Sequence, residues 1–462
     1  MKIFKEVKYL PLIISLGLLL RLFFTLVVAG FYFNRPDIYT DADTGAWATS
    51  FQNLIETGSY TINPDHEYGY FARMPGYSFF LGVFWLILGE WDMVYPVVAY
   101  FQIILDVISI WLVYRICLAW FGSKRTANIV SFLYAVYPFI IVWNPVAYSE
   151  SVSVFLMLSG LYFFSRETRY SVLITGLLLG LAVLFRPQIL FLLPVLALIL
   201  FWKSPNKLRK ITLFCLGVFL SYGVWPLRNW INHDKIILTQ DLRGIPNWNE
   251  DVISFMQYTY SVKAEWEPQF SSIIKNKETH WPKEAYIDSN DSMLLEFAVN
   301  LSKNCGSGFS HWRDYWKKPI DSGDNCNKLI SDIFTYLRNK QINHNPFHFW
   351  IAVPLANLSK ALFKNSLNNN AGFYRKAASF LFYYRTLLIF MGLAGIWVLM
   401  RKRKYIGWVF LLFFLLVYFT LCFGTGPQMR NIEIRYFLHI DVLLLFSAGY
   451  LISLLIKKQK EV

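Results

Sequence analysis

Charged residues are scarce in this sequence of 462 residues. They make up 16% of it, against about 25% in soluble domains, while 55% is hydrophobic and 19% aromatic. So little charge, with a mean hydropathy of +0.38, excludes a soluble enzyme and a disordered chain. Apolar runs about 20 residues long, the length of a helix that crosses a bilayer, recur along the chain. They predict an all-α polytopic membrane protein, because a helix satisfies its own backbone hydrogen bonds in lipid.

Cysteine is also rare, with five residues in the whole chain. This number excludes a disulfide-rich secreted module. Only Cys305 and Cys326 lie outside the apolar runs, on the expected outer side of the membrane, where they either form a disulfide or remain free thiols. The sequence contains no internal repeat, P-loop, dinucleotide-binding fingerprint or zinc-ligand spacing.

Acidic residues are fewer than basic ones, 30 against 44, which gives a net charge of +14. In a membrane protein we attribute this excess to Lys and Arg at the cytoplasmic ends of helices, and not to a nucleic-acid partner. The apolar segment 75–89 is about 15 residues long, which is short for a span. If it crossed the membrane, the later basic clusters would lie outside. We therefore expect it to dip in without crossing, with both termini cytoplasmic and ten spans near 9–33, 94–120, 127–143, 150–165, 171–185, 188–202, 211–227, 377–400, 405–423 and 435–456.

These spans divide the chain into three regions. Residues 1–230 form a transmembrane module that includes a first outer loop at 34–93, residues 228–376 form a long outer loop, and residues 377–462 form C-terminal transmembrane helices. Within the long loop, His348 to Phe363 has the spacing of an amphipathic helix, which we expect on the membrane surface.

Two charges lie inside the expected spans. Arg21 and Asp106 fall at similar depths of neighbouring helices, where an unpaired charge costs several kcal/mol. We expect a structural ion pair between them.

The first outer loop carries two carboxylates one residue apart, Asp41 and Asp43. Such a pair serves as a general base with its orienting partner, or holds a divalent cation such as Mg²⁺ or Mn²⁺. Arg73 lies at the start of the short apolar segment. The Asp pair and this arginine therefore lie at the two ends of one loop near the bilayer surface. This arrangement suits a substrate whose phosphate lies at headgroup level and whose tail lies in lipid.

An ordered set of motifs extends this pattern along the chain, although each motif alone is loose. The set consists of Asp41-x-Asp43 with Trp47, Leu54 to Tyr60, Arg73-Met74-Pro75-Gly76-Tyr77, Asn144 to Glu150, Gly180 to Pro187, Pro226-Leu227-Arg228-Asn229 and Glu433-Ile434-Arg435-Tyr436. In this order it resembles the GT-C glycosyltransferases, in the branch of the protein O-mannosyltransferases and aminoarabinose transferases. The resemblance covers most of residues 9–230 and 377–456, and the long loop matches nothing.

The resemblance implies an enzyme that moves a sugar from a polyprenyl-phosphate carrier, such as undecaprenyl phosphate, to the hydroxyl of a glycan, lipid or protein, with inversion. Asp43 matches the first-loop acid of the family and would act as general base, with Asp41 orienting it. The lipid phosphate leaves as a stable anion, so it needs cations and no general acid. We expect these cations at the outer ends of the spans, from Arg73, Arg186, Arg228 and Arg435.

Two further acids have two interpretations each. Glu150 starts a span where the family often has another acid, so it is either an active-site acid or a helix-start carboxylate favoured by the helix dipole. Glu433 is expected to pair with a nearby arginine. The Asp pair fits both a cation site and a metal-free base, which leaves metal dependence open.

Two other functions are compatible with many spans and a large outer loop. A polymerase or ligase of lipid-linked glycans would place its catalytic arginines and histidine in the large loop. A transporter or flippase would place charges along a mid-membrane path and often contain a repeat. Here the charges gather at the outer face, so we expect a glycosyltransferase of a bacterial inner membrane, with its active site facing outward and no nucleic-acid partner.

Overall fold

The computed structural model describes residues 9–166, 168–203, 206–262, 266–315, 326–363, 373–426, 429–430 and 432–459. All regular elements of this described part are helices, and none is a strand. The predicted all-α membrane class is therefore confirmed.

Within the described residues, six apolar helical stretches are long enough to cross a bilayer. The elements that form them are α1 to α2 (Tyr9–Phe23, with a π-helical turn at Phe24–Val28, then Ala29–Phe33), α5 (Trp91–Phe121), α11 to α12 (Lys207–Val218 and Val224–His233), α19 (Phe373–Arg401), α20 (Tyr405–Phe423) and η10 with α21 (Ile434–Phe437 and Leu438–Gln459).

Shorter apolar helices lie at three further expected spans, so the number of spans stays a prediction. They are α8 (Glu150–Phe164), α9 (Arg169–Phe185) and α10 (Leu192–Lys203), the last preceded by η4 (Pro187–Phe191). The segment expected to dip into the membrane without crossing it forms another short apolar helix, α4 (Pro75–Leu88), and this expectation also stays a prediction.

The expected continuous span 127–143 is wrong. The structure has α6 (Lys124–Ala135) and a separate short helix α7 (Pro138–Ile141). Pro138 has no N–H to donate to the preceding turn, and its ring clashes with that turn, so the first helix ends before it.

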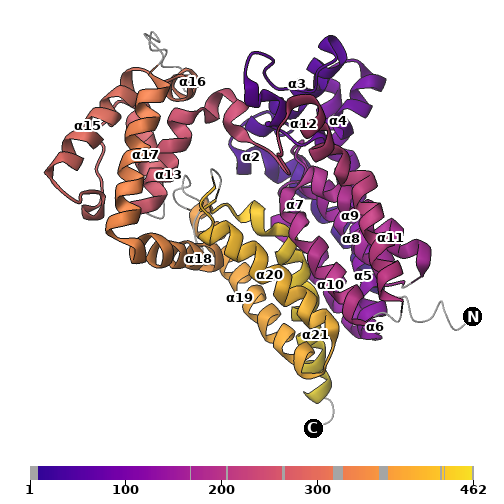
Figure 1. The fold of residues 1–462 in the computed structure, drawn as a ribbon. Helices are drawn as coiled ribbons and strands as arrows, with labels where there is room; N and C mark the ends of the chain where they lie inside the picture. Colours follow the sequence, from indigo (N-terminus) through magenta and orange to yellow (C-terminus); the bar gives the residue numbers. More distant parts are fainter. Residues whose placement is uncertain are drawn as a thin grey trace, which may run out of the picture.

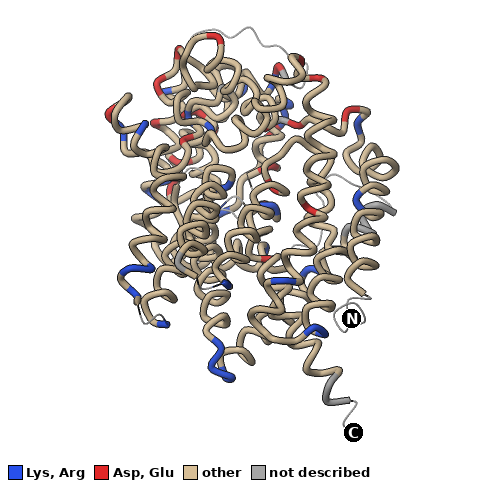
Figure 2. Tube along the Cα trace, turned by 90° about the vertical axis from the view of Figure 1, so that its right-hand side faces the viewer, with Lys and Arg blue, Asp and Glu red and all other residues tan. Residues whose placement is uncertain are grey.

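The turns between helices define two ends of the bundle. One end, here called the basic end, carries the α5–α6, α10–α11 and α19–α20 turns with their Lys and Arg residues, and most acidic residues lie toward the opposite end (Figure 2). This opposite end, here called the loop end, carries α3 (Ala42–Thr57), α4 and α12 (Figure 1). Helix α4 packs against α3 there, with Gly82 pressed on the ring of Phe51.

The expected ion pair inside the bundle is confirmed. Arg21 Nε lies 2.7 Å from Asp106 Oδ2, and both side chains are fully buried. The guanidinium also donates to the carbonyl oxygens of Gly17 and Ala135, and the Tyr134 hydroxyl donates to the other Asp106 oxygen. Both carboxylate oxygens of Asp106 and two of the three guanidinium nitrogens of Arg21 are therefore hydrogen-bonded, which makes this buried charge pair tolerable in lipid.

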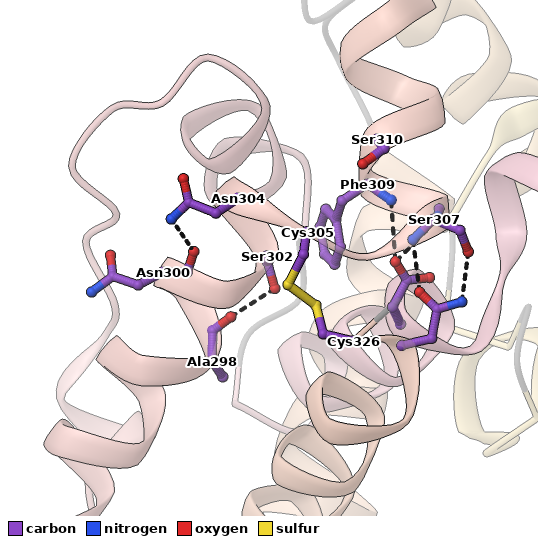
Figure 3. Close-up of a disulfide and its surroundings, with 12 residues drawn as sticks. Ala298, Asn300, Ser302, Asn304, Cys305, Ser307, Phe309, Ser310 and Cys326 are labelled. Atoms are coloured by element: carbon purple, nitrogen blue, oxygen red, sulfur yellow. Dashed lines mark hydrogen bonds between the residues drawn. A yellow bond between two sulfur atoms is a disulfide. The ribbon is translucent and has the colours of Figure 1, made fainter. Parts of the chain in front are cut away.

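The long loop folds into a helical domain with its own aromatic core, here called the outer domain. Its main helices are α13 (Glu250–Val262), α14 (Glu267–Ile274), α15 (Ser289–Asn304), α16 (Ser307–Tyr315) and α17 (Asn327–His344). Asp251 accepts hydrogen bonds from the backbone N–H groups of Gly308 and Phe309, which joins α13 to α16. Cys305 and Cys326 form a disulfide that joins the end of α15 to the start of α17 (Figure 3).

The predicted helix at 348–363 is present as η9 (His348–Ala352) followed by α18 (Val353–Phe363). It lies crosswise between the outer domain and the bundle (Figure 1). Its place on a membrane surface stays a prediction.

Candidate active site

Asp43 is the second residue of α3, which begins directly after the turn that follows the first span. A carboxylate in the first turn is favoured by the positive end of the helix dipole. Its backbone N–H points to the hydroxyl of Tyr148, at 3.4 Å. Trp47, one turn further along α3, packs edge-on against the same tyrosine ring. The predicted catalytic acid is thus fixed at the loop end of the bundle.

Two arginines hold the Asp43 carboxylate from both sides. Arg73 Nη2 lies 2.6 Å from one oxygen and Arg435 Nη1 lies 2.8 Å from the other. The Arg73 guanidinium also lies over the Trp47 ring, 5.0 Å from its centroid. Burial raises the pKa of Asp43, but the attraction of Arg73 and Arg435 outweighs it and holds that pKa well below the usual range. Asp43 is therefore fully ionised in this state.

A third arginine and two further carboxylates surround this clamp. Arg186 pairs with Glu150, whose carboxylate is completely buried. Arg435 also donates to Glu433 from its Nε, at 2.6 Å, so the predicted pairing of Glu433 with an arginine is confirmed. Asp43, Glu150 and Glu433 thus balance three guanidinium charges.

Asp43, Glu433 and the three arginines line one small cavity, here called the Asp43 pocket, and Glu150 lies buried behind Arg186. The volume of this pocket is about 70 Å³, and its walls come from α3, the start of α4, the α9–η4 junction, the outer domain and the residues before α21. The walls include Asp43, Trp47, Arg73, Met74, Phe185, Arg186, Pro187, Gln188, Gln240, Leu242, Trp248, Met256, Glu433, Arg435 and Tyr436.

Two expected site residues lie elsewhere, which corrects the prediction. Arg228 is not in the pocket, because it donates to the backbone carbonyl oxygens of Tyr60 and Tyr70 and so braces the first outer loop. Asp41 does not line the Asp43 pocket, and one of its carboxylate oxygens lies 3.1 Å from Arg35. Three of the four expected arginines therefore converge.

The structure does not leave Glu150 available as an active-site acid, which was one of its two interpretations. Its buried carboxylate is paired with Arg186, so it acts as a partner of that guanidinium and is not a free acid. No sequence pattern indicated Gln240, Trp248 and Met256, which the long loop adds to the pocket, because their positions depend on how that loop folds back.

The residues do not fit a divalent cation in this arrangement. Both Asp43 oxygens accept from arginines, and Asp41 faces Arg35. Within the described ranges, no three His, Cys, Asp or Glu side chains gather as metal ligands would. Hard cations need several oxygen ligands at once.

The described chain is an apolar helical bundle with a first-loop acid held between arginines at one end, which agrees with the GT-C fold that the motifs predict. The profile of the dolichyl-phosphate-mannose-protein mannosyltransferase family matches residues 72–230. The resemblance inferred from the motifs is therefore confirmed over this part of the chain. No curated protein matches the sequence.

Solved structures agree on the fold. The chain is similar to the archaeal oligosaccharyltransferase AglB from Archaeoglobus fulgidus in complex with an inhibitory peptide and a dolichol-phosphate, with a TM-score of 0.54, 13% identity and coverage of 99% of this chain and 51% of that one. The apo form of the same oligosaccharyltransferase has a TM-score of 0.52 and 13% identity, with coverage of 97% of this chain and 51% of that one. This chain thus spans about half the length of AglB. ArnT from Cupriavidus metallidurans bound to undecaprenyl phosphate gives a TM-score of only 0.35 at 12% identity, covering 96% of this chain and 78% of that one.

Proposed function

We propose that this protein is a membrane glycosyltransferase that takes a sugar from a polyprenyl-phosphate carrier and gives it to an acceptor hydroxyl. The single observation that carries this proposal is the carboxylate of Asp43 held between Arg73 and Arg435 in a pocket that Arg186 also lines. A base and three cations within one pocket are what displacement of a phosphate from an anomeric carbon requires.

The clamp suggests how phosphate binding prepares the base. Guanidinium groups bind phosphate oxygens in the same forked geometry as carboxylate oxygens. When the carrier phosphate enters, Arg73 and Arg435 turn part of their hydrogen bonds from Asp43 to the phosphate. The pKa of Asp43 then rises toward its ordinary value, and the carboxylate becomes a better proton acceptor.

Transfer follows in one inverting displacement. The acceptor oxygen attacks the anomeric carbon while Asp43 removes the hydroxyl proton. The bond from that carbon to the phosphate oxygen breaks, and the electron pair leaves with the lipid phosphate. Arg73, Arg186 and Arg435 stabilise the charge that develops on the leaving oxygen.

The bundle offers a place for the lipid chain. A second cavity of about 230 Å³ shares Gln188, Gln240 and Tyr436 with the Asp43 pocket and continues past Phe191 and Leu421. Apolar walls at the loop ends of η4 and α20 suit the first isoprene units of a carrier.

Three further parts of the proposal follow from the site. The reaction is metal-free, because arginines already occupy the carboxylate oxygens that a cation would need. The protein lies in a bacterial inner membrane with the Asp43 pocket facing outward, which the basic turns at the opposite end support. The acceptor is a glycan, lipid or protein that approaches from the outer domain.

The test is Asp43→Asn, with Asp41→Asn as the matched control. Purified protein would be given a labelled polyprenyl-phosphate sugar, and the loss of label from the carrier followed. We expect Asp43→Asn to slow transfer by about 10²- to 10⁴-fold, the usual contribution of a general base. Asp41→Asn removes the same charge outside the pocket and should change the rate by only a few-fold. Full activity of Asp43→Asn would refute the base assignment.

A further inference from the structure

A second cleft, here called the Arg228 cleft, lies at the loop end between the end of α3, the start of α4 and α12 (Figure 1). Its volume is about 710 Å³, which falls within the range of about 300–1,000 Å³ that is common for ligand sites. The described residues that line it include none from the Asp43 pocket, and none from the apolar cavity that suits the carrier's lipid chain. The cleft is therefore a separate site.

The wall that α12 contributes changes from apolar to charged to polar toward the loop end. Val224 is 56% exposed, Arg228 lies one turn further along the helix, and Asn232 one turn beyond that. Each step is about 6 Å at 1.5 Å per residue. The headgroup layer on one side of a bilayer is about 5–8 Å thick. Because α12 ends a span, this order matches that of the acyl chain, phosphate and outer headgroup of a phospholipid. Phe79 of α4, 45% exposed, adds a second apolar wall.

Arg228 has donors left for a ligand. Its guanidinium donates to the backbone oxygens of Tyr60 and Tyr70 and to the side-chain oxygen of Asn229. These three hydrogen bonds use at most three of its five N–H groups, so at least two remain, and within the described part of the chain no carboxylate pairs with it. Arginine is suited to phosphate because its planar guanidinium donates two hydrogen bonds at once.

The rest of the polar wall carries no opposing charge. Ser59, Asn232 and His233 line the cleft together with Arg228, and no Asp or Glu is among the described residues that do so. The cleft is therefore positively charged, which is complementary to a headgroup with a net negative charge. Basic pockets between membrane helices bind anionic lipid headgroups for the same reason.

We infer that the Arg228 cleft binds an anionic phospholipid of the surrounding membrane. The lipid phosphate lies on Arg228, the outer part of the headgroup lies beside Asn232, and an acyl chain follows Val224 and Phe79. This lipid is not the sugar carrier, whose phosphate belongs to the Asp43 pocket, and it takes no part in the transfer.

The bound lipid lies against a wall that the two sites share. Pro75 lines the Arg228 cleft, and Arg73 and Met74, directly before it in the chain, line the Asp43 pocket. Arg228 also holds the backbone of the same outer loop. A lipid in the cleft therefore stabilises the loop that carries Arg73, and a ligand that binds only the folded state raises the Tm by mass action.

Lipid binding to the purified full-length protein tests the cleft without any transfer reaction. Isothermal titration in uncharged detergent would use three probes. They are dioctanoyl phosphatidylglycerol, which has a net negative charge, dioctanoyl phosphatidylcholine, which has the same phosphate but no net charge, and inorganic phosphate. Thermal unfolding of each preparation with and without phosphatidylglycerol would follow.

Two variants change the cleft and leave Arg228 in place, because its removal would also release the outer loop. Val224→Trp fills the apolar part, and Val83→Trp is its matched control, since Val83 of α4 is also 56% exposed but does not line the cleft. Asn232→Asp adds a negative charge one turn from Arg228 at an exposed position, and Asn300→Asp makes the same change at an exposed position of α15.

We expect phosphatidylglycerol to bind the wild-type protein and both controls alike, and to bind more tightly than phosphatidylcholine. Its affinity should fall at least 10-fold in Val224→Trp. In Asn232→Asp it should fall about 3- to 10-fold, the effect of a unit charge about 6 Å away near a protein surface. Without lipid all four variants should unfold near the wild-type temperature, and phosphatidylglycerol should raise the Tm of the controls but not that of Val224→Trp.

Unchanged affinity for phosphatidylglycerol in both Val224→Trp and Asn232→Asp would overturn the site. A loss in Val224→Trp alone would overturn the preference for an anionic headgroup. Inorganic phosphate that binds as tightly as phosphatidylglycerol would overturn a lipid ligand, and much weaker binding would support it. Both variants lie outside the Asp43 pocket, so failure here is distinguishable from failure of the proposed transfer.

Discussion

Replacement of Glu150 by Gln should have two effects of opposite sign. Glu150 is completely buried, its partner Arg186 is 10% exposed, and one of its carboxylate oxygens has no hydrogen-bond partner among the described residues. Removing one partner of a buried pair costs about 3–5 kcal/mol when the other charge stays dry. Arg186 lines the Asp43 pocket and can take water, so we expect a loss of about 1–3 kcal/mol and a lower Tm.

The same change should strengthen phosphate binding. Three guanidiniums face three carboxylates in the free site, so an incoming phosphate competes with Glu150 for Arg186. Without that competitor, the Kd for a short-chain polyprenyl phosphate should fall about 5- to 10-fold, or about 1–1.4 kcal/mol. Thermal unfolding and titration of the same preparation measure both effects.

Glu296→Gln, an exposed substitution on α15, is the control and should change neither quantity. If Glu150→Gln is as stable as the wild type and binds the phosphate no more tightly, Glu150 does not compete with phosphate for Arg186. The balance of charges in the pocket would then not affect phosphate binding.

Four further outcomes follow from the structure. Arg21→Met should cost about 3–5 kcal/mol of stability, because it leaves Asp106 without its arginine. A charge-swapped double variant should not restore that stability, because Arg21 also donates to two carbonyl oxygens. A double-mutant cycle with neutral substitutions measures the coupling between the two residues. Cys305→Ser should lower the free energy of unfolding of the outer domain by about 3 kcal/mol for a loop of this length, and its Tm with it. Thermal unfolding with and without reductant measures this. Because its folded-state pKa is lowered, Asp43 stays ionised and contributes stability above its ordinary pKa of 3.8. The ionised form and that stability are lost as the pH falls through the lower folded-state pKa. The acid limb of kcat/KM should therefore lie below pH ~4 and move upward in Arg73→Gln. EDTA should leave transfer unchanged, whereas a loss that Mg²⁺ or Mn²⁺ reverses would show that a cation displaces one of the arginines from Asp43.

Burial and spacing explain what the sequence could predict. Arg21 and Asp106 each interrupt a long apolar run, so their depth, and hence their pairing, follow from counting residues. The same reasoning would have found the second buried pair, Arg385 with Asp441 at 2.6 Å, because both also lie within apolar helices. The helix break at Pro138 could also be predicted, because proline ends a helix, but a hydropathy profile alone does not detect it.

The direction of a side chain at a helix end could not be predicted. Arg186 and Arg228 both end spans at the loop end, yet one lines the Asp43 pocket and the other braces the backbone at Tyr60 and Tyr70. Hydropathy fixes the depth of such a residue and says nothing about its rotation. The contribution of Trp248 from the outer domain depends on contacts between distant segments, which no local pattern encodes.

If the Asp43 pocket binds the carrier phosphate as proposed, the arrangement of charges explains why the pocket is stable without it. Three buried arginines would repel one another in a low-dielectric pocket, but Asp43, Glu150 and Glu433 supply three negative charges at the positions where phosphate oxygens would otherwise be needed. Binding of the carrier then exchanges one set of oxygens for another, so little new desolvation is needed. Asp43 is held by two of these arginines, so under the proposed function its basicity depends strongly on whether phosphate is bound.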